Sequence, residues 1–143
     1  MSDILQDLPI KAPIQRVFDA ISTPEGLNAW WTLTCKGTPR AGAQFELDFG
    51  PEYVWQAKVR QCEAPVLFEL EMTRADEDWL GSRVTFRLQE KGEATWLQFA
   101  HTGWTTPNEH YRISSHCWAM YLRILRRSIE YGEVVPYKDR LEV

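Results

Sequence analysis

The chain has 143 residues, a formal net charge of −4 at pH 7 and a pI of about 5.4. Its length fits one domain, residues 1–143, and a domain of this size buries roughly 70% of its unfolded surface without disulfides or a metal. The acidic balance, the lack of a long apolar run and the absence of a basic leader are not typical of nucleic-acid binders, membrane-spanning proteins or secreted precursors. We therefore expect a cytoplasmic domain with no nucleic-acid partner and no membrane span.

The three cysteines, Cys35, Cys62 and Cys117, are odd in number and lie far apart in the sequence. There is no C-x-x-C pair, so neither a zinc site nor a redox pair is indicated, and reduced thiols are typical of cytoplasmic proteins. The sequence also lacks a Ser/His/Asp order, a glycine-rich phosphate loop and a metal-ligand spacing. We therefore predict no cofactor, no metal and no catalytic residue.

The N-terminal third predicts a strand and two short helices. The strand covers residues 4–12 and ends before Pro13, which suits the first turn of a helix. Apolar side chains then recur at helical spacing in Ile14, Val17, Phe18 and Ile21. A second helix begins near Pro24, with Leu27, Trp30 and Trp31 on its apolar side.

The adjacent tryptophans Trp30 and Trp31 cannot share one role, because neighbouring helical residues point about 100° apart. One is expected to pack the second helix onto the sheet, since a buried Trp covers roughly 150–250 Å². The other is expected to border the mouth of a cavity. The sequence leaves open which of them does which.

From residue 42 the apolar period changes from helical spacing to two. Five runs alternate in this way: residues 44–50, 53–61, 66–74, 82–90 and 95–104. Turn signals separate them, so the pattern predicts an antiparallel meander with one buried face. Asp48, Glu69 and Glu71 alternate outward, so we do not pair them as a catalytic dyad.

Residues 107–132 predict one long helix, opened by Pro107-Asn108 and closed by Gly132. It must cover the apolar face of the curved sheet, which gives an α+β fold. Polar or small residues occupy the centre of its apolar arc: His110, Ser114, Cys117, Tyr121 and Ser128. An unsatisfied buried hydroxyl costs about 1–3 kcal/mol, so this stripe indicates either a cavity reached by a ligand or a filled core with local hydrogen bonds.

His101 shares the inward face of the last strand with Leu97 and Phe99. A lone inward histidine is commonly a hydrogen-bonded core residue, but with Ser114 and Tyr121 it can also orient the polar end of an apolar ligand. Trp118 lies at the edge of the apolar arc and is expected to be structural. The cavity hypothesis has this predicted lining: Trp55, Phe68, Phe86, Phe99, His101, Ser114, Cys117 and Tyr121, with Trp30 or Trp31 at the entrance.

Two stretches resemble a known family. "IKAPIQRVFDAISTPEGLNAWWT" is similar to the N-terminal signature of the AHSA-like proteins (activator of heat shock protein 90 ATPase homologues), a branch of the START-like, or SRPBCC, superfamily. "HTGW" at the end of the last strand and Trp118-x-x-x-Leu122-x-x-Leu125, followed by Glu130-x-Gly132, match the family's C-terminal pattern. Together they bracket nearly the whole chain.

The resemblance implies the helix-grip fold, in which a curved antiparallel sheet wraps around a long C-terminal helix and two short helices follow the first strand. It also implies a cavity that often holds a hydrophobic molecule. Two departures are present. Gly42-Ala43 stands where many members have Gly-Gly, and Cys117 precedes Trp118 where many have glycine. The larger residue at 117 is expected to narrow or reshape the cavity.

Three functions fit this resemblance. The leading hypothesis is a binding protein for a small hydrophobic or aromatic molecule. The second is an enzyme of the cyclase or hydrolase type that uses His101 and Tyr121 as acid and base. The third is a co-chaperone-like protein of the stress response that binds a chaperone, or a second copy of itself, through its surface. The eukaryotic activators carry a further N-terminal domain that this sequence does not show, which weighs against the third.

Overall fold

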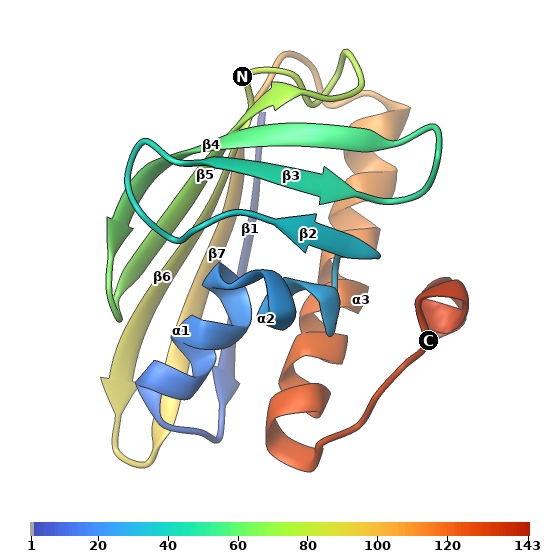
Figure 1. The fold of residues 1–143 in the computed structure, drawn as a ribbon. Coiled ribbons are helices and arrows are strands. Elements are labelled where there is room, and N and C mark those ends of the chain that lie inside the picture. Colours follow the sequence, from blue (N-terminus) through green and yellow to red (C-terminus); the bar gives the residue numbers. More distant parts are fainter. Residues whose placement is uncertain (1) are drawn as a thin grey trace.

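The computed structural model describes residues 2–143, which form a seven-stranded antiparallel sheet curved around one long helix (Figure 1). The strands are β1 (Ser2–Ile10), β2 (Thr34–Lys36), β3 (Gln44–Asp48), β4 (Val54–Glu63), β5 (Leu67–Arg74), β6 (Arg83–Lys91) and β7 (Ala94–Trp104). The helices are α1 (Ile14–Ser22), α2 (Pro24–Asn28), α3 (Glu109–Tyr131) and the 3₁₀ helix η1 (Tyr137–Glu142). This arrangement confirms the predicted α+β helix-grip fold.

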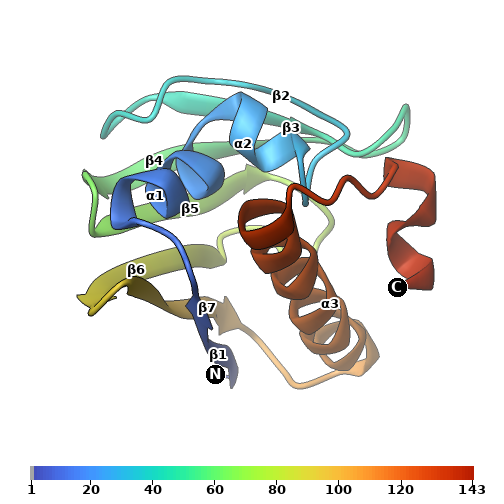
Figure 2. The same cartoon turned by 90° about the horizontal axis from the view of Figure 1, so that it is seen from below.

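The order of the strands in the sheet is β1-β7-β6-β5-β4-β3-β2, so β1 and β2 are its edges. Register shifts in the β4–β5 ladder, between Gln56 and Ala57 and between Val59 and Gln61, add local twist. Viewed from below, the sheet wraps around α3 (Figure 2). Its apolar face is fully buried along the middle strands, with these side chains: Phe45, Leu47, Ala57, Val59, Phe68, Leu70, Val84, Phe86, Leu97 and Phe99.

Helix α3 begins and ends at the capping residues that the sequence indicated. The Asn108 side chain accepts a hydrogen bond from the Tyr111 N–H at 2.9 Å. Gly132 ends the helix in the left-handed conformation, with φ of 65°, which a residue with a side chain adopts at a cost.

Helices α1 and α2 close one end of the concave face (Figures 1 and 2). They bury Val17, Phe18, Ile21 and Leu27 against the sheet and α3. The two helices approach closely at Gly26, where a Cβ atom would lie 2.3 Å from the carbonyl oxygen of Asp19. Only glycine fits there, so the short α2 is held at a fixed place and carries the two tryptophans that follow it.

Two elements were not predicted from the sequence. Strand β2 has only three residues, which is too short for a period to show, and it exists because it pairs with β3. Helix η1 has six residues and follows an extended stretch after α3. Glu69 alternates outward as expected, yet it is almost fully buried because Thr85 and Gln61 cover it and donate hydrogen bonds at 2.7 and 3.2 Å.

Candidate functional site

A pocket of about 460 Å³ lies between α3, the β3–β4 hairpin, the β5–β6 loop and η1. Eight of its fourteen lining residues are aromatic: Trp31, Phe49, Tyr53, Trp55, Trp79, Trp118, Tyr121 and Tyr137. The others are Asp76, His110, Ile113, Ser114, Cys117 and Leu141. Tyr53, Ile113 and Leu141 are exposed, so the pocket has an apolar rim at the protein surface.

Four tryptophans from different parts of the chain form a continuous wall. The ring centroids of Trp31 and Trp118 are 5.1 Å apart, and those of Trp55 and Trp79 are 5.0 Å apart. Trp79 and Trp118 join the two pairs, because their rings are nearly parallel at 5.9 Å. Aromatic pairs of this kind contribute roughly 0.5–1.5 kcal/mol beyond the area they bury, so the four rings stabilise one another in the absence of a ligand.

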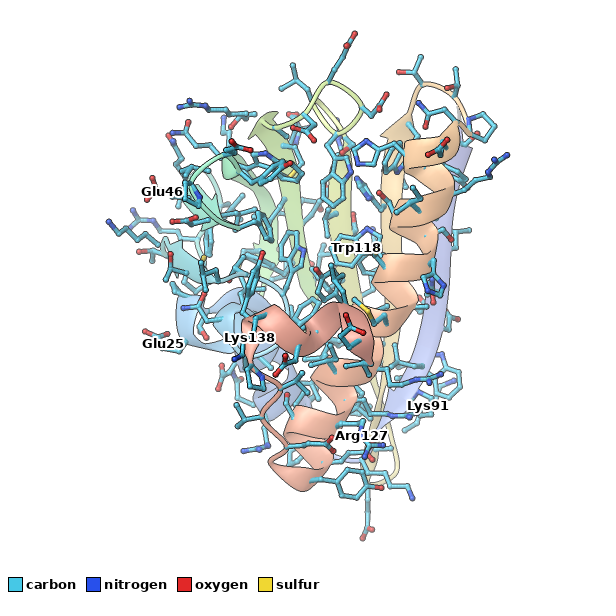
Figure 3. The ribbon with its side chains drawn as sticks, turned by 90° about the vertical axis from the view of Figure 1, so that its right-hand side faces the viewer. Glu25, Glu46, Lys91, Trp118, Arg127 and Lys138 are labelled. Carbon is cyan, nitrogen blue, oxygen red and sulfur yellow. The ribbon has the colours of Figure 1, made fainter. Side chains whose placement is uncertain are left out.

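Hydrogen bonds fix two of these tryptophans through His101. Trp118 Nε1 donates to His101 Nδ1 at 3.0 Å, so that ring nitrogen carries no proton. The proton is therefore on Nε2, which donates to Ser82 Oγ at 2.8 Å, and Ser82 Oγ donates to the Trp79 carbonyl at 2.6 Å. Trp79 Nε1 donates to Ser114 Oγ at 3.3 Å and completes the chain. Trp118 lies between α3 and the sheet in Figure 3.

His101 is fully buried and does not line the pocket. Burial, with a smaller contribution from His110, lowers the pKa of His101 to about 3. It is neutral at physiological pH and both of its ring nitrogens are bonded within the protein. It positions the tryptophan wall and is not placed to exchange protons with a molecule in the pocket.

Tyr121 and Cys117 supply the polar groups on the α3 side of the pocket. Burial, and then the nearby Tyr137 and Cys117, raise the pKa of Tyr121 to about 12. Tyr121 lines the pocket, and its hydroxyl takes part in none of the hydrogen bonds found within residues 2–143. Burial also raises the pKa of the Cys117 thiol, so both groups are protonated and Tyr121 is free to donate to a ligand.

Arg140 attaches the C-terminal segment that forms one side of the pocket. Its Nη2 donates to the Asn28 carbonyl at 2.7 Å and its Nη1 to the Thr32 carbonyl at 3.3 Å. Tyr137 Oη donates to the Phe49 carbonyl at 3.1 Å. In Figure 3 the segment, which carries Lys138, crosses in front of α3. The guanidinium lies at the carbonyl end of α2, where a cation is favoured.

Five of the ten site residues expected from the sequence line the pocket: Trp31, Trp55, Ser114, Cys117 and Tyr121. The other five are packed in the core outside its lining: Trp30, Phe68, Phe86, Phe99 and His101. The physical reason is that two large side chains fill the expected cavity over the central strands. The ring centroids of Trp30 and Phe86 are 6.0 Å apart, and those of Trp118 and Phe99 are 4.5 Å apart.

The two adjacent tryptophans follow α2 in a turn, and their rings stack with centroids 6.0 Å apart, so they do not point apart as neighbours in a helix would. Both are buried, but only one of them lines the pocket. Trp30 is fully buried and its Nε1 donates to the Ala20 carbonyl at 3.0 Å, which ties α2 to α1. Trp31 lines the pocket. Trp118 corrects the sequence interpretation, because it lies at the centre of the buried face of α3 instead of its edge. It is both a core residue and a pocket wall.

Sequence reasoning missed nine lining residues: Phe49, Tyr53, Asp76, Trp79, His110, Ile113, Trp118, Tyr137 and Leu141. Trp79 is the most informative of them. It lies in the β5–β6 loop, where periodicity gives no orientation, and the only available signal was a tryptophan in an otherwise acidic turn, "ADEDW". Its burial was not expected.

A second cavity, of about 540 Å³, lies between α1, α2 and the end of α3. It is larger than the first, but none of its lining residues is aromatic and several are charged, including Arg16, Asp19 and Glu133. Specific small-molecule sites are mostly apolar with a few polar groups, which fits the first pocket better. Among the described residues, no group of three His, Cys, Asp or Glu side chains could hold a metal ion.

A curved antiparallel sheet around a long C-terminal helix, with a pocket between them, is the helix-grip architecture of START-like proteins. The chain belongs to the family of activator of Hsp90 ATPase homolog 1-like proteins, whose family model matches residues 11–130. This confirms the resemblance seen in the sequence. Within residues 2–143, no helix has the length and apolar character to cross a membrane.

Solved structures support the same architecture. The Aha1 dimer from Colwellia psychrerythraea is similar with a TM-score of 0.84 and 24% identity, over 93% of this chain and 99% of that one. Protein BH1534 from Bacillus halodurans is similar with a TM-score of 0.76 and 27% identity, over 91% and 98%. CalU16 from Micromonospora echinospora is similar with a TM-score of 0.74 and 25% identity, over 98% of this chain and 84% of that one. Comparison with the curated proteins gave no match.

Proposed function

We propose that the protein binds a small apolar or aromatic molecule reversibly in the tryptophan-walled pocket and does not convert it. The observation that carries this proposal is the lining, in which eight of fourteen residues are aromatic around about 460 Å³. Pockets of roughly 300–1,000 Å³ with apolar walls and few polar groups are typical of small-molecule sites. We expect the protein to act in the cytoplasm, where its three free cysteines stay reduced.

The polar groups in the pocket suit orientation of a ligand. The Tyr121 hydroxyl takes part in no hydrogen bond found within the described residues and can donate one to a ligand. Ser114 Oγ already accepts from Trp79 and can still donate. A ligand with an acceptor group beside a planar apolar body would therefore satisfy both the wall and these hydroxyls.

The enzyme alternative has less support. It needs His101 and Tyr121 to act on a ligand together, and a general base must come within about 2.6–3.2 Å of the proton that it takes. His101 is outside the pocket lining and already bonded at both nitrogens, while the high pKa of Tyr121 keeps its proton in place. Turnover that depends on His101 would overturn the proposal.

A titration with the neutral fluorescent dye N-phenylnaphthylamine tests the proposal. We expect saturable binding to the wild-type protein and loss of at least about tenfold in affinity for Cys117→Phe, because a phenyl group there fills the pocket. The matched control is His116→Phe, which adds the same ring at an exposed neighbouring position that does not line the pocket. Absence of saturable binding, or equal loss in both variants, would contradict the proposal.

The family name and the dimeric relative motivate the surface-partner alternative. On that account the protein would bind a chaperone or a second copy of itself, and the pocket would be incidental. The dye titration separates the two, because a surface partner does not require Cys117→Phe to abolish dye binding. A failed titration would leave the surface as the better candidate.

A further inference from the structure

We propose that the pocket selects a ligand that carries a cationic group, such as a quaternary ammonium or protonated amine, on an aromatic or apolar body. This inference rests on the proposed function and adds the charge of the ligand to it. It follows from the charges around the pocket and from the kind of rings in its wall.

The one fixed charge in the lining is negative. Asp76 is the single carboxylate among the fourteen lining residues, and none of them is a lysine or arginine. Asp76 is exposed in the β5–β6 loop, and its carboxylate has no ion-pair or hydrogen-bond partner within residues 2–143. The neighbouring Glu77 and Asp78 add negative charge on the same loop, so the potential at this side of the mouth favours a cation.

Asp78 is already paired, whereas Asp76, the one carboxylate of the loop that lines the pocket, is not. Asp78 contacts His110 Nδ1 at 3.0 Å and accepts from Asn108 Nδ2 at 3.1 Å. These contacts attach the loop to the start of α3 and hold Asp76 at the pocket. His110 is the one imidazole in the lining, and its Nδ1 lies 3.0 Å from the Asp78 carboxylate.

Two of the rings that line the pocket together with Asp76, those of Trp55 and Trp79, are indoles. Trp79, three residues further along the loop, donates its backbone N–H to the Asp76 carbonyl at 2.9 Å. Its ring centroid is 5.0 Å from that of Trp55, with the two planes tilted by 51°. Indole has the most negative ring face of the aromatic side chains, and cages of such rings are used to bind quaternary ammonium groups.

The buried cation Arg140 is not part of the pocket lining and borders the second cavity instead. It stacks on Tyr137 at 5.3 Å and is held by the Asn28 and Thr32 carbonyls, outside the lining. A bound cation would therefore lie beside Asp76, Trp55 and Trp79. The apolar body of the ligand would lie toward Trp31, Trp118 and Tyr121.

Three probes with the same ring test the proposal: naphthylmethyl-trimethylammonium, its neutral carbon isostere neopentylnaphthalene, and anionic naphthylacetate. Isothermal titration calorimetry on the full chain should give about tenfold tighter binding for the cation than for the neutral isostere, with the anion weakest. The preference should shrink as salt is added, because Asp76 is exposed.

Asp76→Asn should remove most of the preference for the cation and leave the affinity of the neutral isostere unchanged. The matched control is Glu77→Gln, which removes the adjacent carboxylate outside the lining and should leave most of the preference intact. Equal binding of the cation and the neutral isostere would overturn the cation proposal and leave the binding function standing. If neither the cation nor its neutral isostere binds, the cation proposal and the proposed binding function are both overturned.

Discussion

The space between α3 and the sheet has two ends that are built from similar residues and differ in their cover. At the end under α1 and α2, aromatic rings pack on one another in a closed core, with Phe45 and Phe68 5.8 Å apart and both fully buried. At the other end, Trp31, Trp55 and Trp79 surround a pocket. Aromatic content therefore does not distinguish a core from a binding site in this protein.

The difference lies in what covers each end. The closed end is covered by an amphipathic helix, α1, which inserts Val17 and Phe18 between the sheet and α3. The open end is covered only by two loops and η1, a six-residue helix with exposed Leu141. These loops and η1 are too short to pack against every aromatic ring beneath them. The rings that they leave uncovered on one side form the walls of the pocket.

Trp118 belongs to both ends, so its removal should have the largest effect. Its ring contacts Trp30 at 6.5 Å on the closed side and Trp31 at 5.1 Å on the open side. Trp118→Ala should lower the free energy of unfolding by about 3–5 kcal/mol, as large-to-small core substitutions do. Chemical denaturation measures this. A loss below about 1 kcal/mol would contradict the account. The control is Trp96→Ala, on the other side of the sheet from α3, which should cost less than Trp118→Ala.

Arg140 tests the cover of the open end. Arg140→Gln removes hydrogen bonds from a charged donor to the Asn28 and Thr32 carbonyls, and should lower the free energy of unfolding by about 1.5–3 kcal/mol. We also expect η1 to become accessible to protease, which limited proteolysis would detect. Unchanged protease resistance would show that η1 stays in place without this anchor. Lys138→Gln, in the same exposed segment, is the control.

His101 tests the wall between the two ends through pH. Its pKa is about 3 in the folded protein and 6.5 in the unfolded chain, so the unfolded state binds one more proton between these values. Stability should therefore fall as pH drops through this window, by up to about 1.4 kcal/mol per unit from this residue. His101→Gln can still accept from Trp118 and donate to Ser82 but has no proton to gain. Urea unfolding at several pH values gives the free energy of unfolding as a function of pH. This free energy should fall less steeply with decreasing pH in the variant than in the wild type, and the same steepness in both would contradict the assignment.

Tyr121 should give the smallest effect and the most selective one. Tyr121→Phe removes a hydroxyl that takes part in no hydrogen bond found within residues 2–143, so the free energy of unfolding should change by less than about 0.5 kcal/mol. Affinity for a planar probe with a carbonyl acceptor should fall by roughly three- to tenfold. Affinity for a probe without an acceptor should not change. A large loss of stability would instead place the hydroxyl in a structural hydrogen bond.

The fold was largely predictable because most of its strands and its long helix come from segments with a regular period of apolar residues. The period-two runs gave five strands, and Asn108 and Gly132 marked the ends of α3. The contrast with η1 explains what was missed. Its position depends on Arg140 reaching carbonyls 108 and 112 residues away in sequence, and no local pattern encodes such a contact.

The site was predictable only in part, for a related reason. Alternation placed Phe86, Phe99 and His101 correctly on the inner face, but that face serves both ends of the space. Whether an inward side chain contacts a ligand depends on whether another residue fills the space between it and α3. Here Trp30 and Trp118 fill that room, and the volumes of side chains on separate elements cannot be added up from the sequence alone.

The central claim is that only one end of the helix–sheet space accepts a ligand, and the indole N–H signals of the seven tryptophans test it directly in a two-dimensional NMR titration. With the cationic naphthyl probe, the account predicts concentration-dependent shifts for four wall residues, Trp31, Trp55, Trp79 and Trp118. The signal of Trp96, on the other side of the sheet from α3, should stay in place, and that of Trp30, whose ring centroid lies 6.0 Å from that of Trp31, should shift less than those of the wall residues. Shifts of similar size at Trp30 or Trp96, or none at the four wall residues, would contradict it.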